Sequence, residues 1–120
     1  MSGKLTTHVL DMSTGKPAAG LTIELWKYND NVGDYEKLQE AVTMKDGRLE
    51  QPLLEGDTLT AGRYELLFHV GAYFATMEVV TDDPPFLNVI PVSFGIANNH
   101  DDYHVPLLIA PGGYSTYRGS

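Results

Sequence analysis

The chain has 120 residues, the length of a single domain, and 42% of them are hydrophobic, which is enough to build a buried core. It carries 8 lysines and arginines against 16 aspartates and glutamates, and the resulting net charge of −8 argues against nucleic acid as a partner. The absence of cysteine excludes disulfides and thiolate chemistry, and with no apolar run of membrane-spanning length and no apolar signal region at the start we expect a cytoplasmic protein without a membrane partner.

Short segments of alternating apolar and polar residues recur along the chain between turn sequences, a pattern typical of an all-β sandwich. Only Gly71–Thr76 is predicted to be helical, and Pro91 predicts that its strand lies at a sheet edge or contains a bulge. About eight strands can form two packed antiparallel sheets, in one domain over residues 1–120. The predicted strands, in chain order, are Leu5–Leu10, Leu21–Tyr28, Tyr35–Thr43, a short strand near Arg48–Leu53, Tyr64–Val70, Leu87–Ile96, Tyr103–Ala110 and Tyr114–Ser120.

Two predicted strands each place one histidine on the face that points away from the core. His8 alternates with Leu5, Thr7 and Val9, and His104 alternates with the apolar set Tyr103, Val105, Leu107 and Ile109. Their own faces still carry Leu10, Pro106 and Leu108, and an apolar outer face suggests burial against a second subunit. Partial desolvation favours the neutral imidazole, which is the form that a general base needs.

Each polar candidate has a catalytic and an ordinary structural interpretation. His8 and His104 are either an acid–base pair or two strand histidines with local hydrogen bonds. Arg48 follows the Asp46-Gly47 turn signal, where its guanidinium can clamp a carbonyl or an anion or can simply be solvated. Tyr117 either donates a hydrogen bond to a planar substrate or packs as a strand aromatic residue.

Three other chemistries are disfavoured. His100 and His104 have a metal-like spacing, but it spans a loop and a strand start instead of a helix, so no metal site is expected. Ser115 and Ser120 lack the sharp turn that exposes a nucleophile, which argues against an acyl-enzyme. Gly112 and its neighbour Gly113 lack the context of a phosphate loop and are predicted to form a hairpin turn.

Five segments of the chain together resemble the 5-hydroxyisourate hydrolase branch of the transthyretin family. The resemblance runs from about Leu5 to Ser120, and the terminal Tyr-Arg-Gly-Ser is its most specific part because it separates the hydrolases from the hormone carrier. The segments are His8–Asp11, Lys45–Arg48, Val70–Phe74, Tyr103–Leu108 and Tyr114–Ser120.

The resemblance implies a transthyretin-like sandwich of two four-stranded antiparallel sheets with one short helix, assembled as a homotetramer that is a dimer of dimers. It implies hydrolysis of 5-hydroxyisourate to 2-oxo-4-hydroxy-4-carboxy-5-ureidoimidazoline in urate degradation, without metal or cofactor. By motif, His8, Arg48 and His104 are expected to be catalytic, and Tyr117 and Ser120 to contact the substrate.

The family pattern leaves some questions open. Many relatives have a histidine where this chain has Asp102, so no role is carried over to that position. Which of His8 and His104 is the general base stays undecided. A noncatalytic carrier of a small aromatic ligand, as in transthyretin, is the alternative function, and a β-sandwich interaction module is a weaker one; the two histidines and the Arg118–Ser120 tail favour the enzyme.

Overall fold

The computed structural model describes residues 3–120, and nearly all of the regular structure is β-strand. A 3₁₀ turn, η1 (Gly56–Thr58), and one short helix, α1 (Val70–Thr76), interrupt the strands. Neither helix is long and apolar enough to span a membrane. The strands are β1 (Lys4–Asp11), β2 (Lys16–Pro17), β3 (Thr22–Asn29), β4 (Asp34–Val42), β5 (Leu54–Glu55), β6 (Gly62–Phe68), β7 (Ile90–Ile96), β8 (Tyr103–Ala110) and β9 (Gly113–Thr116).

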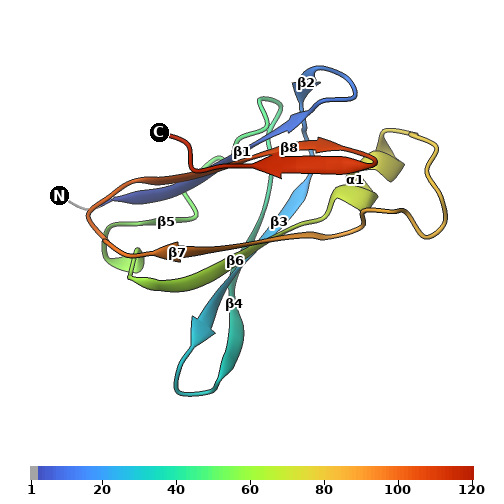
Figure 1. Cartoon of the computed structure of the whole chain (residues 1–120). Coiled ribbons are helices and arrows are strands. Elements are labelled where there is room, and N and C mark those ends of the chain that lie inside the picture. Colours follow the sequence, from blue (N-terminus) through green and yellow to red (C-terminus); the bar gives the residue numbers. More distant parts are fainter. Residues whose placement is uncertain (1–2) are drawn as a thin grey trace.

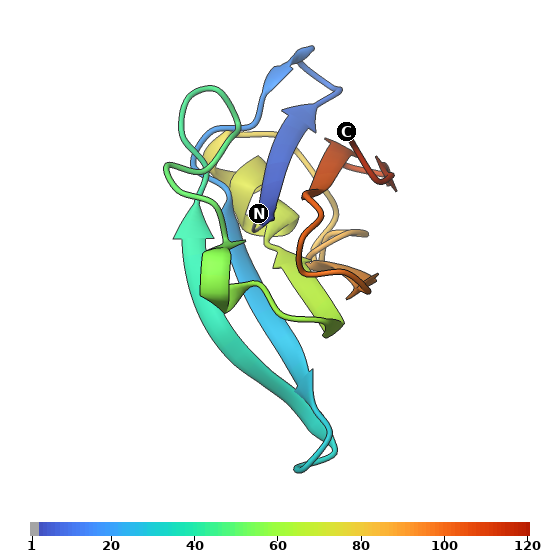
Figure 2. The ribbon, with the colours of Figure 1, turned by 90° about the vertical axis from the view of Figure 1, so that its left-hand side faces the viewer.

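Two sheets pack face to face to form a sandwich (Figure 1). One sheet has the order β2-β1-β8-β9, with β5 also paired to β1, and the other has the order β4-β3-β6-β7. The β3–β4 hairpin extends beyond the two layers (Figure 2). This is the all-β sandwich architecture expected from the sequence.

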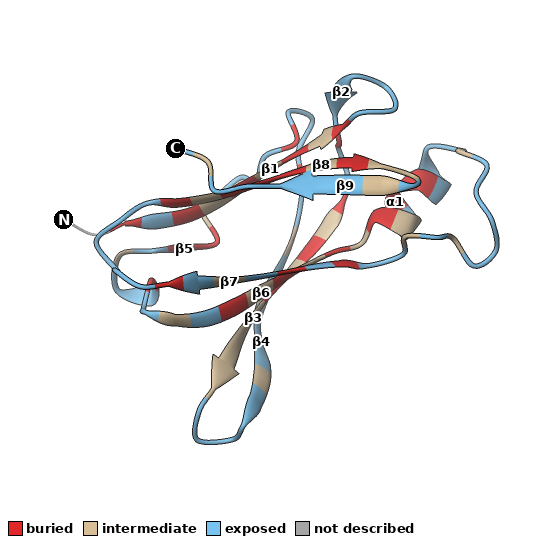
Figure 3. Ribbon diagram, viewed as in Figure 1, coloured by how far each residue is buried: buried red, intermediate tan, exposed pale blue. Residues whose placement is uncertain are grey.

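Alternation along the strands explains where the core lies (Figure 3). In β1 the residues Leu5, Thr7 and Val9 are buried while the residues between them are half-buried. In β8 the whole predicted apolar face is buried, and on the opposite face His104, Leu108 and Ala110 are half-buried while Pro106 is buried. The histidines are thereby directed to the outer face of this sheet.

The sheets differ from the expectation in two details. The sheet that carries the histidines has a fifth, two-residue strand, and β1 pairs with β8 in parallel. A parallel pair requires a long connection, and here nearly the whole chain lies between the two strands. The sequence pattern of a single strand contains no information about the direction of its neighbour, so this pairing was not predicted.

Several strand boundaries were also predicted wrongly. The short strand expected near Arg48–Leu53 is instead an isolated bridge at Arg48 followed by β5, and β2 and η1 lie in segments predicted as loops. β7 begins at Ile90 instead of Leu87, and β9 ends at Thr116. Pro91 does lie on an edge strand, as predicted, because β7 borders only β6.

Candidate active site

The parallel pairing of β1 and β8 brings the two histidines close together. Thr6 lies opposite His104 in the register, and His8 lies opposite Pro106, so the histidines are diagonal neighbours on one outer face. Both are half-buried. Residues 96 positions apart in the chain therefore face the same space.

Arg48 reaches this face through a tight turn over residues 45–47. Gly47 has φ +78° and lies so close to β1 that a Cβ atom would be 2.4 Å from the carbonyl oxygen of Val9. The amide of Val9 donates to the carbonyl oxygen of Gly47 (2.9 Å), and an isolated antiparallel bridge pairs His8 with Arg48. The turn thus fixes Arg48 beside His8.

The imidazole of His8 is held by the same turn. Its Nε2 lies 2.8 Å from the carbonyl oxygen of Asp46. A carbonyl oxygen can only accept a hydrogen bond, so Nε2 carries the hydrogen and donates it. The carboxylate of Asp46 accepts from the amide of Arg48 (2.9 Å), which stabilises the turn. The neutral form of His8 therefore has its lone pair on Nδ1.

The imidazole of His104 has a different environment. Its Nδ1 shares a 2.8 Å hydrogen bond with Oγ1 of Thr6, and its Nε2 has no hydrogen-bond partner among residues 3–120. Burial lowers the pKa of His104 below its ordinary value of 6.5, and the positive charge of Arg48 and the nearby His8 lower it further. His104 is therefore a neutral imidazole at pH 7 with one ring nitrogen free.

A pocket of about 210 Å³ lies beside this group. Thr6 and Arg48 line it together with the segment 49–52, which follows the turn. Neither His8 nor His104 is among its lining residues, so the pocket adjoins the histidines through Thr6, which bonds to His104, and Arg48, which is bridged to His8.

The two C-terminal candidates, Tyr117 and Ser120, are not grouped with His8, His104 and Arg48. Tyr117 is 59% exposed and lines a separate cavity of about 270 Å³ between β7 and the β8–β9 hairpin, together with Phe94 and Tyr103. Ser120 is exposed at the end of the chain, next to Gly119, whose amide donates to the carbonyl oxygen of His104 (2.8 Å). In the single chain, only His8, His104 and Arg48 are brought together.

Four residues around the histidines were not identified from the sequence: Thr6, Asp46, Gly47 and Gly119 hold the rings or border them. The sequence indicated a turn at Asp46-Gly47, but it did not predict that the carbonyl oxygen of Asp46 accepts a hydrogen bond from His8. Finding Thr6 required the parallel register of β1 and β8. Over the described range 3–120, no three histidine, aspartate or glutamate side chains are placed to hold a metal ion.

Comparison with known proteins gives consistent matches over the whole chain. A model of the HIUase/Transthyretin family matches residues 5–119. The chain is 58% identical over 120 residues to the 5-hydroxyisourate hydrolase of Halalkalibacterium halodurans, with 100% of both chains covered. A solved 5-hydroxyisourate hydrolase from Klebsiella pneumoniae is 39% identical with a TM-score of 0.80, covering 98% of this chain and 94% of that one. The crystal structure of (S)-allantoin synthase is 46% identical with a TM-score of 0.93, and there the match covers 99% of this chain but only 44% of the other.

Proposed function

The chain belongs to the HIUase/Transthyretin family, and from that premise we propose that it is a 5-hydroxyisourate hydrolase whose catalytic groups are His8, His104 and Arg48. The relatives named as this hydrolase support the reaction. The observation that carries the residue assignment is the convergence of two imidazoles and one guanidinium, from β1, β8 and the 45–48 turn, on one outer face.

His104 acts as the general base in this proposal. Its lowered pKa favours the neutral imidazole, in which Nδ1 carries the hydrogen and donates it to Oγ1 of Thr6, so the lone pair that accepts a proton is on Nε2. Nε2 takes a proton from water while the water oxygen forms a bond to a ring carbonyl carbon of the substrate. The carbon–nitrogen bond of the ring then breaks, and the proton is returned to the leaving nitrogen.

Arg48 and His8 complete the reaction. The guanidinium of Arg48, which lines the pocket of about 210 Å³, faces the oxygen on which negative charge develops and stabilises that charge. His8 is anchored through Nε2 to the carbonyl oxygen of Asp46, so Nδ1 is the atom left to orient water or the substrate. The carrier alternative gives no role to this neutral base beside an arginine.

The assembled form proposed is a homotetramer, a dimer of dimers, with the outer faces of β1 and β8 lining a channel. Leu10 and Leu108 keep this face apolar beside the histidines, which supports its burial by a second copy. Tyr117 and Ser120 remain proposed substrate contacts of the assembled enzyme. The expected cytoplasmic location also remains a prediction. Light scattering coupled to size exclusion should give four times the mass of one chain.

The reaction is tested by the ultraviolet decay of freshly prepared 5-hydroxyisourate with and without the protein. We expect rapid decay with the wild type and a loss of ~10²-fold in kcat for His8→Ala, because the group that orients water or the substrate is lost. The tetramer mass of the variant serves as the folding control. A wild type that leaves the spontaneous decay unchanged would refute the hydrolase, and a fully active His8→Ala would refute the role of His8 alone.

A further inference from the structure

The C-terminal tail returns to β8 after β9 has ended. β9 pairs with β8 from Gly113 to Thr116, and the same register resumes three residues later as an isolated bridge between Gly119 and His104. Pro106 would oppose Tyr117 in this register but has no amide hydrogen to donate, so the ladder is interrupted there. Thr116 Oγ1 donates to the carbonyl oxygen of Pro106 (2.7 Å), and the Gly119 amide then donates to that of His104 (2.8 Å).

Gly119 lies directly against the imidazole of His104. A Cβ atom on Gly119 would be 2.6 Å from Cδ2 of that ring, closer than Cβ atoms come to other atoms, and 3.3 Å from Cγ, which is also a tight contact. Its φ is outside the left-handed region, so the backbone itself would accept any residue. The need for glycine at this position therefore comes from the ring of His104.

Thr6 holds the same ring on its other side. Its Oγ1 lies 2.8 Å from Nδ1 of His104, directly across the parallel β1–β8 pair. The ring thus has a hydroxyl from β1 bonded to Nδ1 and the tail backbone against Cδ2. Nε2, the remaining nitrogen, is the one assigned to take the proton from water.

We propose that Thr6 and Gly119 are a pair of positioning residues that hold the imidazole of His104 between them. This inference rests on the proposed function, because it gives His104 its orientation as the base. A methyl group at position 119 forces the ring to turn or the tail to lift. Either movement displaces Nε2, and a displacement of about 1 Å from reacting geometry can cost ~10²-fold in rate.

The test compares Gly119→Ala with Gly112→Ala. Gly112 is in the same terminal hairpin, also has no left-handed φ, and a Cβ atom there meets nothing within 4 Å. We expect Gly119→Ala to lower kcat by ~10²-fold with little change in KM, and Gly112→Ala to behave as the wild type. If the C-terminal tail does not position the ring of His104, the two variants should have the same kcat, and that result would overturn the proposal.

A second pair of variants tests the other side of the ring. Thr6→Val removes the hydroxyl while keeping the shape, and Thr6→Ser restores a hydroxyl. We expect kcat to fall in Thr6→Val and to recover in Thr6→Ser. This pair decides the proposal if Gly119→Ala fails to fold, and a Thr6→Val enzyme with wild-type kcat would contradict it.

A spectroscopic readout separates this proposal from the proposed function. The chain has 4 histidines, so the ¹⁵N chemical shifts of each imidazole can be resolved and report which ring nitrogen is protonated or hydrogen-bonded. We expect the His104 shifts to change in Gly119→Ala and those of His69 to stay constant. Unchanged His104 shifts refute the positioning role whether or not the wild type hydrolyses 5-hydroxyisourate.

Discussion

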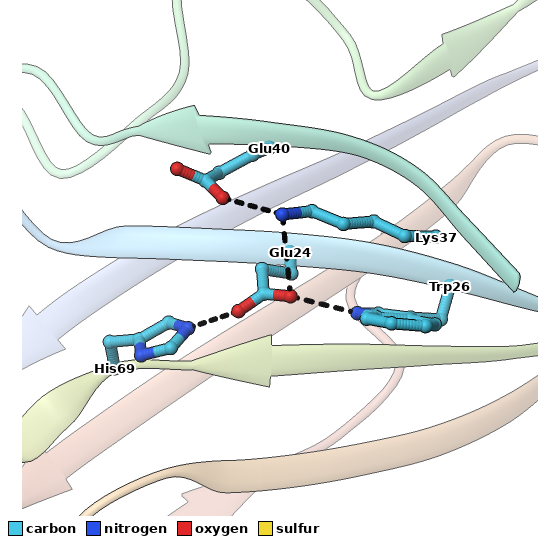
Figure 4. A network of polar contacts seen from close by, with 5 residues as sticks. All are labelled: Glu24, Trp26, Lys37, Glu40 and His69. Carbon is cyan, nitrogen blue, oxygen red and sulfur yellow. Dashed lines mark hydrogen bonds and ion pairs between the residues drawn. The ribbon is translucent and has the colours of Figure 1, made fainter.

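The two outer sheet faces of this chain each carry a half-buried histidine, and the neighbours of the two rings differ. His104 on β8 bonds to a hydroxyl and lies near Arg48 and His8, and its pKa is lowered. His69, just after β6, contacts the carboxylate of Glu24 through Nε2 (Figure 4). A histidine bonded to a carboxylate is engaged as a donor, whereas burial, and after it the charge of Arg48, favours the neutral form of His104, which can accept a proton.

The Glu24 group has the features of a structural network. Its carboxylate also accepts from Nε1 of Trp26 (3.0 Å) and lies 3.6 Å from Nζ of Lys37, which in turn bonds to Glu40 (Figure 4). The hydrogen bond from His69 is the largest cause of the lowered pKa of Glu24. Every polar group drawn there has a partner, and so the comparison assigns chemistry to one face and stability to the other.

The largest expected effect is the difference in activity between His104→Ala and His69→Ala. His104→Ala should lose ~10²–10⁴-fold in kcat because the proposed general base is gone. His69→Ala should keep wild-type kcat and lose only some stability, since one hydrogen bond to Glu24 is removed. Steady-state ultraviolet assays of both variants measure this. Equal losses of activity would show that the two faces do not differ as argued.

A smaller and more specific effect is expected for Arg48. Arg48→Ala should lower kcat by ~10²–10³-fold, the cost of one oxyanion-stabilising group, and Arg48→Lys should recover part of it.

The same variant changes the pH profile in a definite direction. His104 must be unprotonated to act, and its lowered pKa places the acid limb of kcat/KM below pH 6.5 in the wild type. The groups that face it are Thr6, Arg48 and His8, and the charge on Arg48 opposes protonation. Arg48→Ala should therefore move the acid limb to higher pH. An acid limb that moves to lower pH in Arg48→Ala would contradict the effect of the Arg48 charge on His104.

The contrast between the two faces shows what the sequence could and could not predict. Alternation was sufficient to turn His8 and His104 outward, because β8 has one fully apolar face and the inward face of β1 carries Leu5 and Val9. The Asp46-Gly47 turn signal made Arg48 a candidate, and the resemblance of motifs gave it an expected catalytic role. The role of Thr6 depends on which strand lies beside β8 and in which direction, which is a tertiary property. The contact of Gly119 with His104 depends on the C-terminal tail pairing again with β8 beyond the interruption at Pro106. No local sequence propensity predicts this pairing.

His69 also shows what the sequence could not predict. By residue type and exposure it looks as eligible as His104. Only the position of Glu24, 45 residues earlier and on a neighbouring strand, assigns it to a structural pair. Sequence reasoning thus found the catalytic candidates through the family motifs, and the structure supplied the partners that explain why one imidazole is suited to proton transfer.

The smallest expected effect concerns the stability of the Glu24 network. Glu24→Gln should lower the free energy of unfolding by about 1 kcal/mol, since a part-buried carboxylate loses its charged hydrogen bonds, and should leave kcat unchanged. Glu40→Gln is the matched control, because Glu40 is half exposed and bonds to Lys37 at the surface, where an ion pair contributes little. Chemical denaturation of both variants, with the activity assay alongside, measures the difference.

The pH dependence of that difference gives the sharper test. The pKa of Glu24 is lowered in the folded state, so its contribution is fully present above the ordinary value of 4.5 and is lost as the pH falls through the lowered pKa. The stability gap between the wild type and Glu24→Gln should therefore be constant near neutral pH and should close below pH 4.5. A gap that instead widens on acidification would mean that the carboxylate is not stabilised by His69, and the structural assignment of this face would have to be abandoned.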